Sequence, residues 1–355
     1  MSKAFFCTFG GTRGSLIDEL HVLRPQDVPT SDVSRVALGR SFAEEISGLS
    51  FAEKTWDSNE SAARDVRARF ATLPSGEAVA APPLREDEAI HDRFFHVARV
   101  DGCATELFFR SVVAGHVLFL DDLAEIPFDV APDVLDRIDD AFKALESRSL
   151  GTAVASGRRV AVWKSANGPR RSLDRWIRGH QIFAVLTQGL IAAFRDVRAA
   201  LGDVDGPGLD AAVDFAELVL RGAGASLEFT GDLPSEDYLT IVRPSMAPPN
   251  VPETFSGLFS ADHRYFVALL REMAPQLEAL GERRPEHHAR LAAGLGAVYD
   301  GHKFVCERLV GRSPSLMMMS GITQKSGVEQ IEEFKKRRMK AFERPTLQTG
   351  ATASS

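Results

Sequence analysis

The sequence predicts a mainly α-helical protein with a helical bundle in its C-terminal half and a less regular N-terminal region. Apolar residues recur every three to four positions over long segments of the second half, which is the period of an amphipathic helix. Of the 355 residues, 44% are hydrophobic, so the chain can bury a sizeable core. We expect a mixed and helical region over 1–150, a helical domain over 151–345 and a disordered tail over 346–355.

The N-terminal region gives short signals. Helices are predicted around Ser41–Ser47 and Glu60–Phe70. Two apolar runs, Leu107–Val113 and Val117–Leu120, fit either a strand or a buried helix, because short runs carry no distinguishing period. The spacing of apolar residues over Pro132–Glu146 predicts an amphipathic helix.

Four helices with apolar stripes are predicted after residue 172. The second, which carries Phe215, Leu218 and Val219, is expected to end at Gly222 and Gly224, because glycine often follows the last helical turn. The stripes of the first, third and fourth helices are, in order, Phe183, Leu186, Leu190, Phe194, Val197 and Leu201; Phe266, Leu269, Leu270, Met273, Leu277 and Leu280; and Leu291, Leu295, Val298, His302, Val305 and Leu309.

Between the second and third helices, Gly231–Ser260 is rich in proline and glycine and too long for an ordinary bundle connection. Its aromatic and aliphatic residues predict that it is packed, as the wall of a cofactor or substrate cavity. A last helix is predicted to begin at Ser326, whose spacing from Glu329 is that of a capping box. The basic run Lys335–Lys340 is interpreted as the solvated end of that helix.

His302 lies seven residues after Leu295 and seven before Leu309, so it shares their buried stripe. One interpretation is a core histidine hydrogen-bonded to a carbonyl group. The other is a neutral imidazole that binds iron. Cys306 follows one turn later, but two ligands make a poor metal site, so Cys306 is interpreted as a small buried hydrophobic side chain.

Two other histidines have local interpretations. His180 either faces the distal side of an iron site at His302 or is a solvated residue of a first helical turn. His263 is placed in the first turn of the third helix.

Several motifs together resemble one family. His302, Arg308 and Gly311 have the spacing His-x5-Arg-x2-Gly and precede Ser326-Gly327-Val328, which resembles the proximal helix and glycine-rich loop of tryptophan 2,3-dioxygenase and indoleamine 2,3-dioxygenase. Upstream, Tyr238–Arg243 and Phe255–Ala261 resemble the segments of that family beside the substrate carboxylate and the distal haem face.

The resemblance covers roughly Ser172–Phe342, about half the chain. Within the superfamily, the chain start, the length and the continuation Arg243–Met246 look most like the monodechloroaminopyrrolnitrin synthase branch. The resemblance implies a helical bundle that encloses a b-type haem, with O2 or H2O2 as oxidant and an aromatic amino acid as substrate, either a tryptophan or a related indole or phenol.

The resemblance also implies roles for single residues. His302 would be the axial ligand of the iron, and Arg243 and Tyr238 would act in catalysis by binding the carboxylate and the ring of the substrate. The other implied cofactor-binding residues are Phe255, Ser256, Gly257, Phe259 and Arg308, and the other implied substrate-binding residues are Gly321, Thr323 and Ser326.

One departure from the family bears on the reaction. The dioxygenase loop reads Gly-Thr-Gly-Gly, whereas this chain has Gly321-Ile322-Thr323-Gln324, and the register that would bring Ser320, Thr323 or Ser326 to the substrate stays open. This favours a related oxygenation or rearrangement in secondary-metabolite biosynthesis over simple opening of the indole ring. The alternative function is a non-catalytic protein that binds haem or a hydrophobic small molecule as a sensor.

Composition limits the partners and the compartment. A net charge of −7 and a pI near 5.8 disfavour nucleic acid and anionic membranes as partners. The three cysteines have no paired spacing and form no Cys-x-x-Cys-His motif, so a reducing compartment and non-covalently bound haem are expected. No signal peptide or membrane span is recognised, and the prediction is a cytoplasmic monomer or homodimer.

Overall fold

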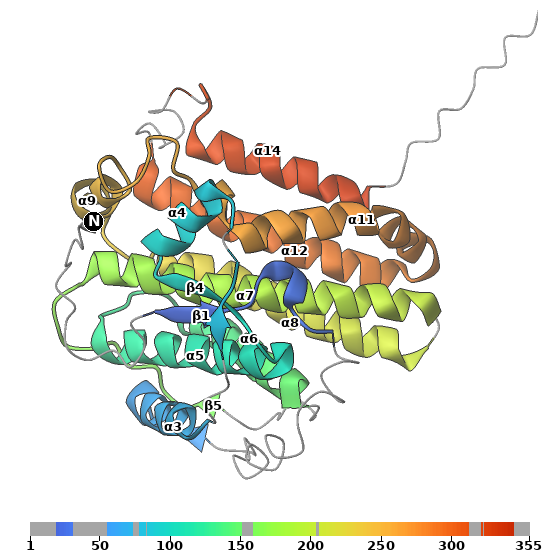
Figure 1. Ribbon diagram of the computed structural model, residues 1–355, viewed down its shortest axis with the longest axis horizontal. Helices are drawn as coiled ribbons and strands as arrows, with labels where there is room; N and C mark the ends of the chain where they lie inside the picture. Colours follow the sequence, from blue (N-terminus) through green and yellow to red (C-terminus); the bar gives the residue numbers. More distant parts are fainter. Residues whose placement is uncertain are drawn as a thin grey trace, which may run out of the picture.

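The computed structural model of the chain describes residues 19–30, 55–73, 78–82, 84–150, 159–203, 206–311, 321 and 323–343. The predicted helix Ser41–Ser47 and the predicted tail 346–355 lie outside these residues. Within them the fold is mainly helical, as predicted, and the long helices stack in layers (Figure 1). These helices are α3 (Asn59–Thr72), α4 (Glu86–Phe94), α5 (Ala104–Glu125), α6 (Pro132–Leu150), α7 (Ser172–Ala200), α8 (Pro207–Thr230), α11 (Ala261–Arg283), α12 (Pro285–Val305) and α14 (Gly327–Met339).

The layers share one core. In Figure 1, α14 lies at one side, followed by α11 and α12, then α7 and α8, then α5 and α6, with α3 at the far side. Helix α8 packs on α6, α7 and α12, while α7 also contacts α5 and α11. Buried hydrophobic side chains run without interruption from the N-terminal region into the bundle. The boundary at residue 150 therefore stays a prediction.

Helix α5 contains both apolar runs for which a strand was an alternative. Leu107–Val113 and Val117–Leu120 are buried turns of one long helix, packed between α3, α6 and α7. Burial on nearly every face removes the amphipathic period, which explains why the sequence pattern could not distinguish helix from strand. The predictions of helices at Glu60–Phe70 and Pro132–Glu146 are confirmed by α3 and α6.

Short strands give the N-terminal region its less regular character. β1 (Leu20–Val22) pairs in parallel with β4 (Val97–Asp101), and β3 (Val79–Ala80) pairs antiparallel with the other edge of β4. β2 (Thr55–Trp56) pairs in parallel with β5 (Arg159–Val160). β4 matters for the site, because it holds Arg99 against α4 and α11.

The prediction that the second bundle helix ends at Gly222 and Gly224 is wrong, since α8 continues to Thr230. Both glycines serve close helix packing. A Cβ at Gly222 would lie 2.2 Å from that of Ala141 on α6, and one at Gly224 would lie 3.3 Å from the Ala297 carbonyl oxygen on α12. Tertiary contact therefore overrides the low helix propensity of glycine.

The segment between α8 and α11 is packed, as predicted, and is built of short helical pieces. These are α9 (Ser235–Asp237), the π-helix η3 (Tyr238–Val242), α10 (Arg243–Ser245) and the 3-10 turn η4 (Gly257–Phe259). A second π-helix, η5 (Cys306–Val310), extends α12 and contacts η3. A π-helix inserts an extra residue in its turn and so re-aims the side chains that follow, and such segments are frequent at functional sites.

Helix α14 begins as predicted. Ser326 accepts a hydrogen bond from the backbone N–H of Glu329, whose carboxylate accepts one from the backbone N–H of Ser326. The remaining 3-10 turns are η1 (Pro25–Asp27), η2 (Leu201–Asp203) and η6 (Lys340–Phe342). None of the helices in the described ranges has the length and apolarity needed to cross a bilayer.

Candidate active site

A cavity of about 270 Å³ lies among α4, α7, α11, α12, α14 and the segment between α8 and α11. Most of its wall is apolar or aromatic, which suits a flat hydrophobic cofactor or an aromatic substrate. The aromatic and aliphatic lining residues are Phe95, Trp176, Phe183, Ala184, Leu190, Leu227, Tyr238, Met246, Phe255, Leu258, Phe266, Leu295, Val298, Tyr299, Val305, Leu309, Val310, Ile331 and Phe334.

The cavity brings together six residues predicted from the sequence. His302 comes from the end of α12, Tyr238 and Arg243 from η3 and α10, and the remaining three, Phe255, Ser256 and Gly257, from the segment before α11. A Cβ at Gly257 would meet no protein atom within 4 Å, so the protein's own packing does not require glycine there. The space beside Gly257 is open.

The His302 imidazole fits the metal-ligand interpretation. Burial lowers its pKa to about 4, so the ring is neutral at neutral pH and keeps a nitrogen lone pair. No described residue forms a hydrogen bond or ion pair with this ring. The alternative interpretation, a core histidine hydrogen-bonded to a carbonyl group, is therefore not supported within the described residues.

Three more histidines, His91, His180 and His263, line the same cavity. Burial lowers the pKa of His180 to about 3 and that of His263 to about 4. His180 and His263 each experience the charges of His91 and His302, which agrees with the closeness of the four rings. Neutral imidazoles are thus available to a metal from α7 and α11 as well as from α12.

His180 has a fixed tautomer. Its Nδ1–H donates to the Trp176 carbonyl oxygen at 2.8 Å, and its ring stacks on Phe95 with 4.0 Å between centroids. Nε2 therefore carries the lone pair. His180 lies in the third turn of α7 and not in a solvated first turn, so that alternative is wrong. His180 lines the cavity, and its place on the distal side of a haem stays a prediction.

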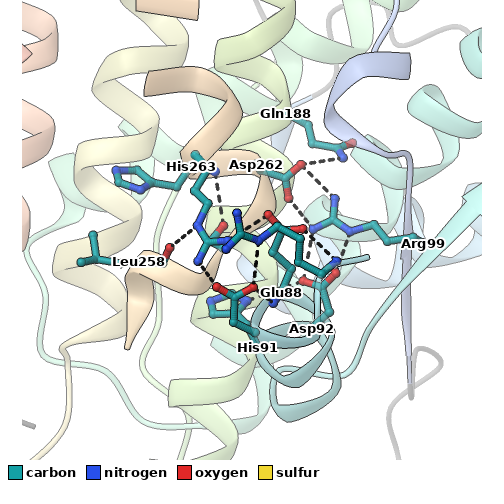
Figure 2. A network of polar contacts seen from close by, with 12 residues as sticks. Glu88, His91, Asp92, Arg99, Gln188, Leu258, Asp262 and His263 are labelled. Atoms are coloured by element: carbon teal, nitrogen blue, oxygen red, sulfur yellow. Dashed lines mark hydrogen bonds and ion pairs between the residues drawn. The ribbon is translucent and has the colours of Figure 1, made fainter. Parts of the chain in front are cut away.

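Figure 2 shows how His91 and His263 are anchored. Asp92 and Asp262 are their chain neighbours, and both carboxylates bind the Arg99 guanidinium, with N–O distances of 2.8 and 3.2 Å to Asp92 and of 2.7 and 2.9 Å to Asp262. All three charged side chains are buried. This ion-pair network ties α4, β4 and α11 together at the cavity wall.

Tyr238 enters the cavity as a neutral phenol. Burial raises its pKa to about 12, although the charge of Arg243 opposes that rise. Its ring packs against Trp176 with 5.4 Å between centroids. Arg243 lines the cavity a few residues later, so an aromatic surface and a guanidinium are presented by one short segment, as the sequence predicted.

Five predicted site residues lie outside the cavity wall. Phe259 faces a neighbouring surface pocket, where it packs under the Arg264 guanidinium. Arg308 pairs with the buried Asp232 at 3.4 Å. The other three belong to the predicted substrate loop, namely Gly321, Thr323 and Ser326.

Local contacts explain the position of that loop. Thr323 Oγ1 accepts from the backbone N–H of Lys325, and Ser326 caps α14, so both hydroxyls serve the backbone. Gly321 has φ +71°, a left-handed conformation that favours glycine. Ser320 and Ile322 lie outside the described residues. Thr323 and Ser326, which were predicted to contact the substrate, therefore do not line the cavity that Arg243 lines.

The sequence missed His91, Arg99 and Trp176. Each sits on an element far from α12 in the chain, and Arg99 and Asp262 are 163 residues apart. The one local feature of the sequence that could have pointed to these residues is an aspartate next to a histidine, in His91-Asp92 and Asp262-His263.

The cavity fits a haem in its chemistry. It offers neutral imidazoles, a largely apolar wall and an open space at Gly257. The described residues contain no cluster of three or more His, Cys, Asp or Glu side chains that would bind a metal ion directly. Cys306, one turn after His302, also lines the cavity, and burial raises the pKa of its thiol to about 11.

Comparisons with known proteins identify the family of the chain. The family model described as SfmD 3-methyl-L-tyrosine peroxygenase matches residues 21–290, which include His91, His180, Arg243 and His263 and end before His302. The 3-methyl-L-tyrosine peroxygenase of Streptomyces lavendulae is 31% identical over 335 residues, 92% of each chain. The crystal structure of reduced SfmD, soaked with sodium hydrosulfite, superposes with a TM-score of 0.67 at 26% identity, over 80% of this chain and 95% of that one.

Proposed function

The chain belongs to the SfmD 3-methyl-L-tyrosine peroxygenase family, and on this premise we propose that it inserts an oxygen atom from peroxide into the ring of a tyrosine-type amino acid. The predicted enzyme class, a haem-dependent oxygenase that acts on an aromatic amino acid, is confirmed at the level of the family. The observation that carries the proposal is the aromatic cavity in which a guanidinium, a buried phenol and neutral histidines meet.

The proposed reaction balances without a further reductant. A ring C–H bond becomes C–OH, one oxygen atom of hydrogen peroxide enters the product, and the other leaves as water with the displaced hydrogen and the second peroxide hydrogen. A haem iron held by a neutral histidine would activate the peroxide, which is the oxidant in this exchange. The protein's own task is to bind, to orient the substrate and to exclude water.

Each role has a residue with suitable chemistry. His302 would hold the iron, because its ring is neutral and forms no hydrogen bond or ion pair with a described residue. Arg243 would bind the substrate carboxylate through the planar fork of its guanidinium. Tyr238 and Trp176, which pack on each other, would hold the ring of the substrate by aromatic contact and by the Tyr238 hydroxyl.

The phenol is favoured over the indole as the ring that reacts. The relatives are named for a methylated tyrosine, whereas the tryptophan substrate and the monodechloroaminopyrrolnitrin synthase branch rest on the sequence resemblance alone and stay predictions. The sensor alternative differs in one respect that can be measured, because a sensor would bind haem without turning over an amino acid.

The first experiment tests binding and turnover in the purified protein. We expect a Soret band that His302→Ala greatly diminishes, while His21→Ala, a change at an exposed histidine of β1, leaves the band unchanged. 3-Methyl-L-tyrosine or L-tyrosine should shift the band, and the shift should vanish in Arg243→Ala. With 18O-labelled hydrogen peroxide, mass spectrometry should find a single labelled oxygen atom in the product. A protein without a Soret band, or with a band that no aromatic amino acid perturbs, would contradict the proposal.

The second experiment tests how haem is retained. The sequence prediction is haem b, held without a covalent bond. Of the two cysteines in the described residues, Cys103 is exposed and Cys306 lines the cavity beside His302. Acid–acetone extraction should therefore release the haem from the wild type. Haem that stays with the wild type but is released from Cys306→Ser would replace the b-type prediction by a covalent link at Cys306.

A further inference from the structure

Arg338, near the end of α14, is placed differently from its basic neighbours. Lys335 pairs with Asp300 at 2.6 Å, and Arg337 pairs with Glu333. Arg338 is half-buried, and none of the carboxylates among the described residues pairs with it. The interpretation of the basic run as a solvated helix end therefore holds for its neighbours and not for Arg338.

The face of α14 that carries Arg338 is the one that faces the cavity. Gly327, Gln330, Ile331 and Phe334 line the cavity at helical spacing. Arg338 follows Phe334 by four residues and Ile331 by seven, so it continues the same face of the helix. Its side chain therefore points toward the end of the cavity.

Electrostatic contacts place the guanidinium beside two lining residues. Burial raises the pKa of Tyr299, and the charge of Arg338 and a hydrogen bond from it oppose that rise. Burial is the main reason for the lowered pKa of His263, and the charge of Arg338 is the next cause. Arg338 thus lies between α12 and the start of α11, where Tyr299 and His263 reach the cavity.

The guanidinium is also incompletely satisfied. Its Nε atom is buried and has no hydrogen-bond partner within the described part of the chain. A buried donor without an acceptor is costly, and the lack of a counterion for a half-buried cation adds to that cost. An anionic oxygen atom delivered by a ligand would satisfy both requirements.

We propose that Arg338 and the Tyr299 hydroxyl form a carboxylate-binding site at the end of the cavity. Arg338 supplies the charge and the planar donors, and Tyr299 can donate its proton to the same carboxylate while it accepts a bond from Arg338. This proposal rests on the proposed function, because the carboxylate belongs either to a haem propionate or to the amino-acid substrate. The chemistry is the same, and the two sources are separated by experiment.

The porphyrin arm uses ferric mesoporphyrin IX, whose ethyl groups cannot react with Cys306, and its dimethyl ester, which lacks the carboxylates. Protein made under haem limitation is titrated with each and followed by quenching of tryptophan fluorescence. If a propionate is bound, Arg338→Gln weakens mesoporphyrin binding roughly tenfold to a hundredfold. The dimethyl ester binds wild type and Arg338→Gln equally. The control Arg337→Gln, at an adjacent surface position, binds mesoporphyrin and its dimethyl ester with the affinities of the wild type.

The substrate arm compares L-tyrosine with tyramine, which lacks the carboxylate, by the shift of the Soret band. If the substrate carboxylate is bound, Arg338→Gln weakens the binding of L-tyrosine by the same factor. The affinities for tyramine and for mesoporphyrin do not change. Arg338→Lys, which keeps the charge, restores part of the lost affinity in either case.

The outcomes separate the two proposals. If Arg338→Gln binds mesoporphyrin and L-tyrosine as tightly as Arg337→Gln does, the carboxylate site is refuted while the proposed function stands. If the wild type binds no porphyrin, the proposed function itself fails. If circular dichroism shows that Arg338→Gln does not fold, Tyr299→Phe is used in its place. Tyr299→Phe is expected to weaken the binding of the same carboxylate ligand by a smaller factor and to leave the affinity for the dimethyl ester or tyramine unchanged.

Discussion

Replacement of Asp262 by asparagine is expected to destabilise the protein strongly, because it removes one carboxylate from a buried ion-pair network. The side chain of Asp262 is 1% exposed and that of Arg99 is 5% exposed, and two hydrogen bonds of 2.7 and 2.9 Å join them. Gln188 adds a third bond to Asp262 at 3.1 Å. In Asp262→Asn, the amide NH2 would face a guanidinium donor, and Arg99 would keep only Asp92 as counterion.

Breaking a buried ion pair by removing one partner typically costs about 3–5 kcal/mol. Desolvation explains this magnitude. The pKa of Arg99 is raised because the bonds and charges of Asp262 and Asp92 outweigh the burial that disfavours its charged form. Loss of one carboxylate leaves much of that burial uncompensated. For a protein of this size we expect a fall in melting temperature of about 5 °C or more.

Urea unfolding followed by circular dichroism measures the change. Asp214→Asn is the matched control, since it is the same chemical substitution in an ion pair with Arg290 whose Asp214 side chain is 62% exposed. Exposed pairs contribute about 0–1 kcal/mol. The double variant Arg99→Gln/Asp262→Asn should lose less than the sum of the two single variants. A loss in Asp262→Asn no larger than in Asp214→Asn would refute the reasoning.

Three further predictions concern other parts of the fold. Burial disfavours the charged form of His116, but the charge of Glu146 and hydrogen bonds to two carboxylates outweigh it and raise the pKa. The stabilisation is therefore complete below about pH 6.5 and is lost as the pH rises through the raised value, so the unfolding free energy should fall more in wild type than in His116→Gln between about pH 6 and about pH 9. Gly222→Ala should cost about 1–3 kcal/mol in thermal unfolding, because its Cβ would lie 2.2 Å from a neighbouring Cβ, whereas Gly208→Ala, with no neighbour within 4 Å, should not. Gly257→Ala should leave the melting temperature unchanged and weaken haem or substrate binding measured by absorbance, and unchanged binding would show that the open space beside it is not used.

Local patterns in the sequence predicted the helical bundle and the position of His302 on the inner face of one of its helices. The amphipathic stripes, the Ser326–Glu329 capping box and the position of His302 all depend on residues within a few turns of one another. Such signals are readable because the helical period and the cap are local properties. Gly222 shows the limit, since its partner Ala141 lies on a different helix and no local pattern announces that contact.

The site itself was predicted only where one segment carries several of its residues. Tyr238 and Arg243 share η3 and α10, and they reach the cavity together. His91 lines the cavity, and Arg99 holds the wall behind it by binding Asp92 and Asp262, a contact between distant segments that periodicity cannot show. The loop residues Thr323 and Ser326 had hydroxyls of suitable chemistry, but backbone groups two or three residues away bind those hydroxyls instead.

The distribution of charge around the cavity connects the two proposals. Buried charged side chains at the cavity wall form close ion pairs with one another, as Arg99 does with Asp92 and Asp262. These pairs hold the wall together. Burial lowers the pKa values of His180, His263 and His302, so these rings are neutral, suit a metal and offer no positive charge to a carboxylate. Arg243 on α10 lines the cavity, and the charge of Arg338 on α14 acts on His263, which also lines it. A haem brings two carboxylates and an amino acid brings one. If carboxylates of both ligands lie within the cavity, a site built on Arg243 alone would leave some of their oxygen atoms without a cationic partner.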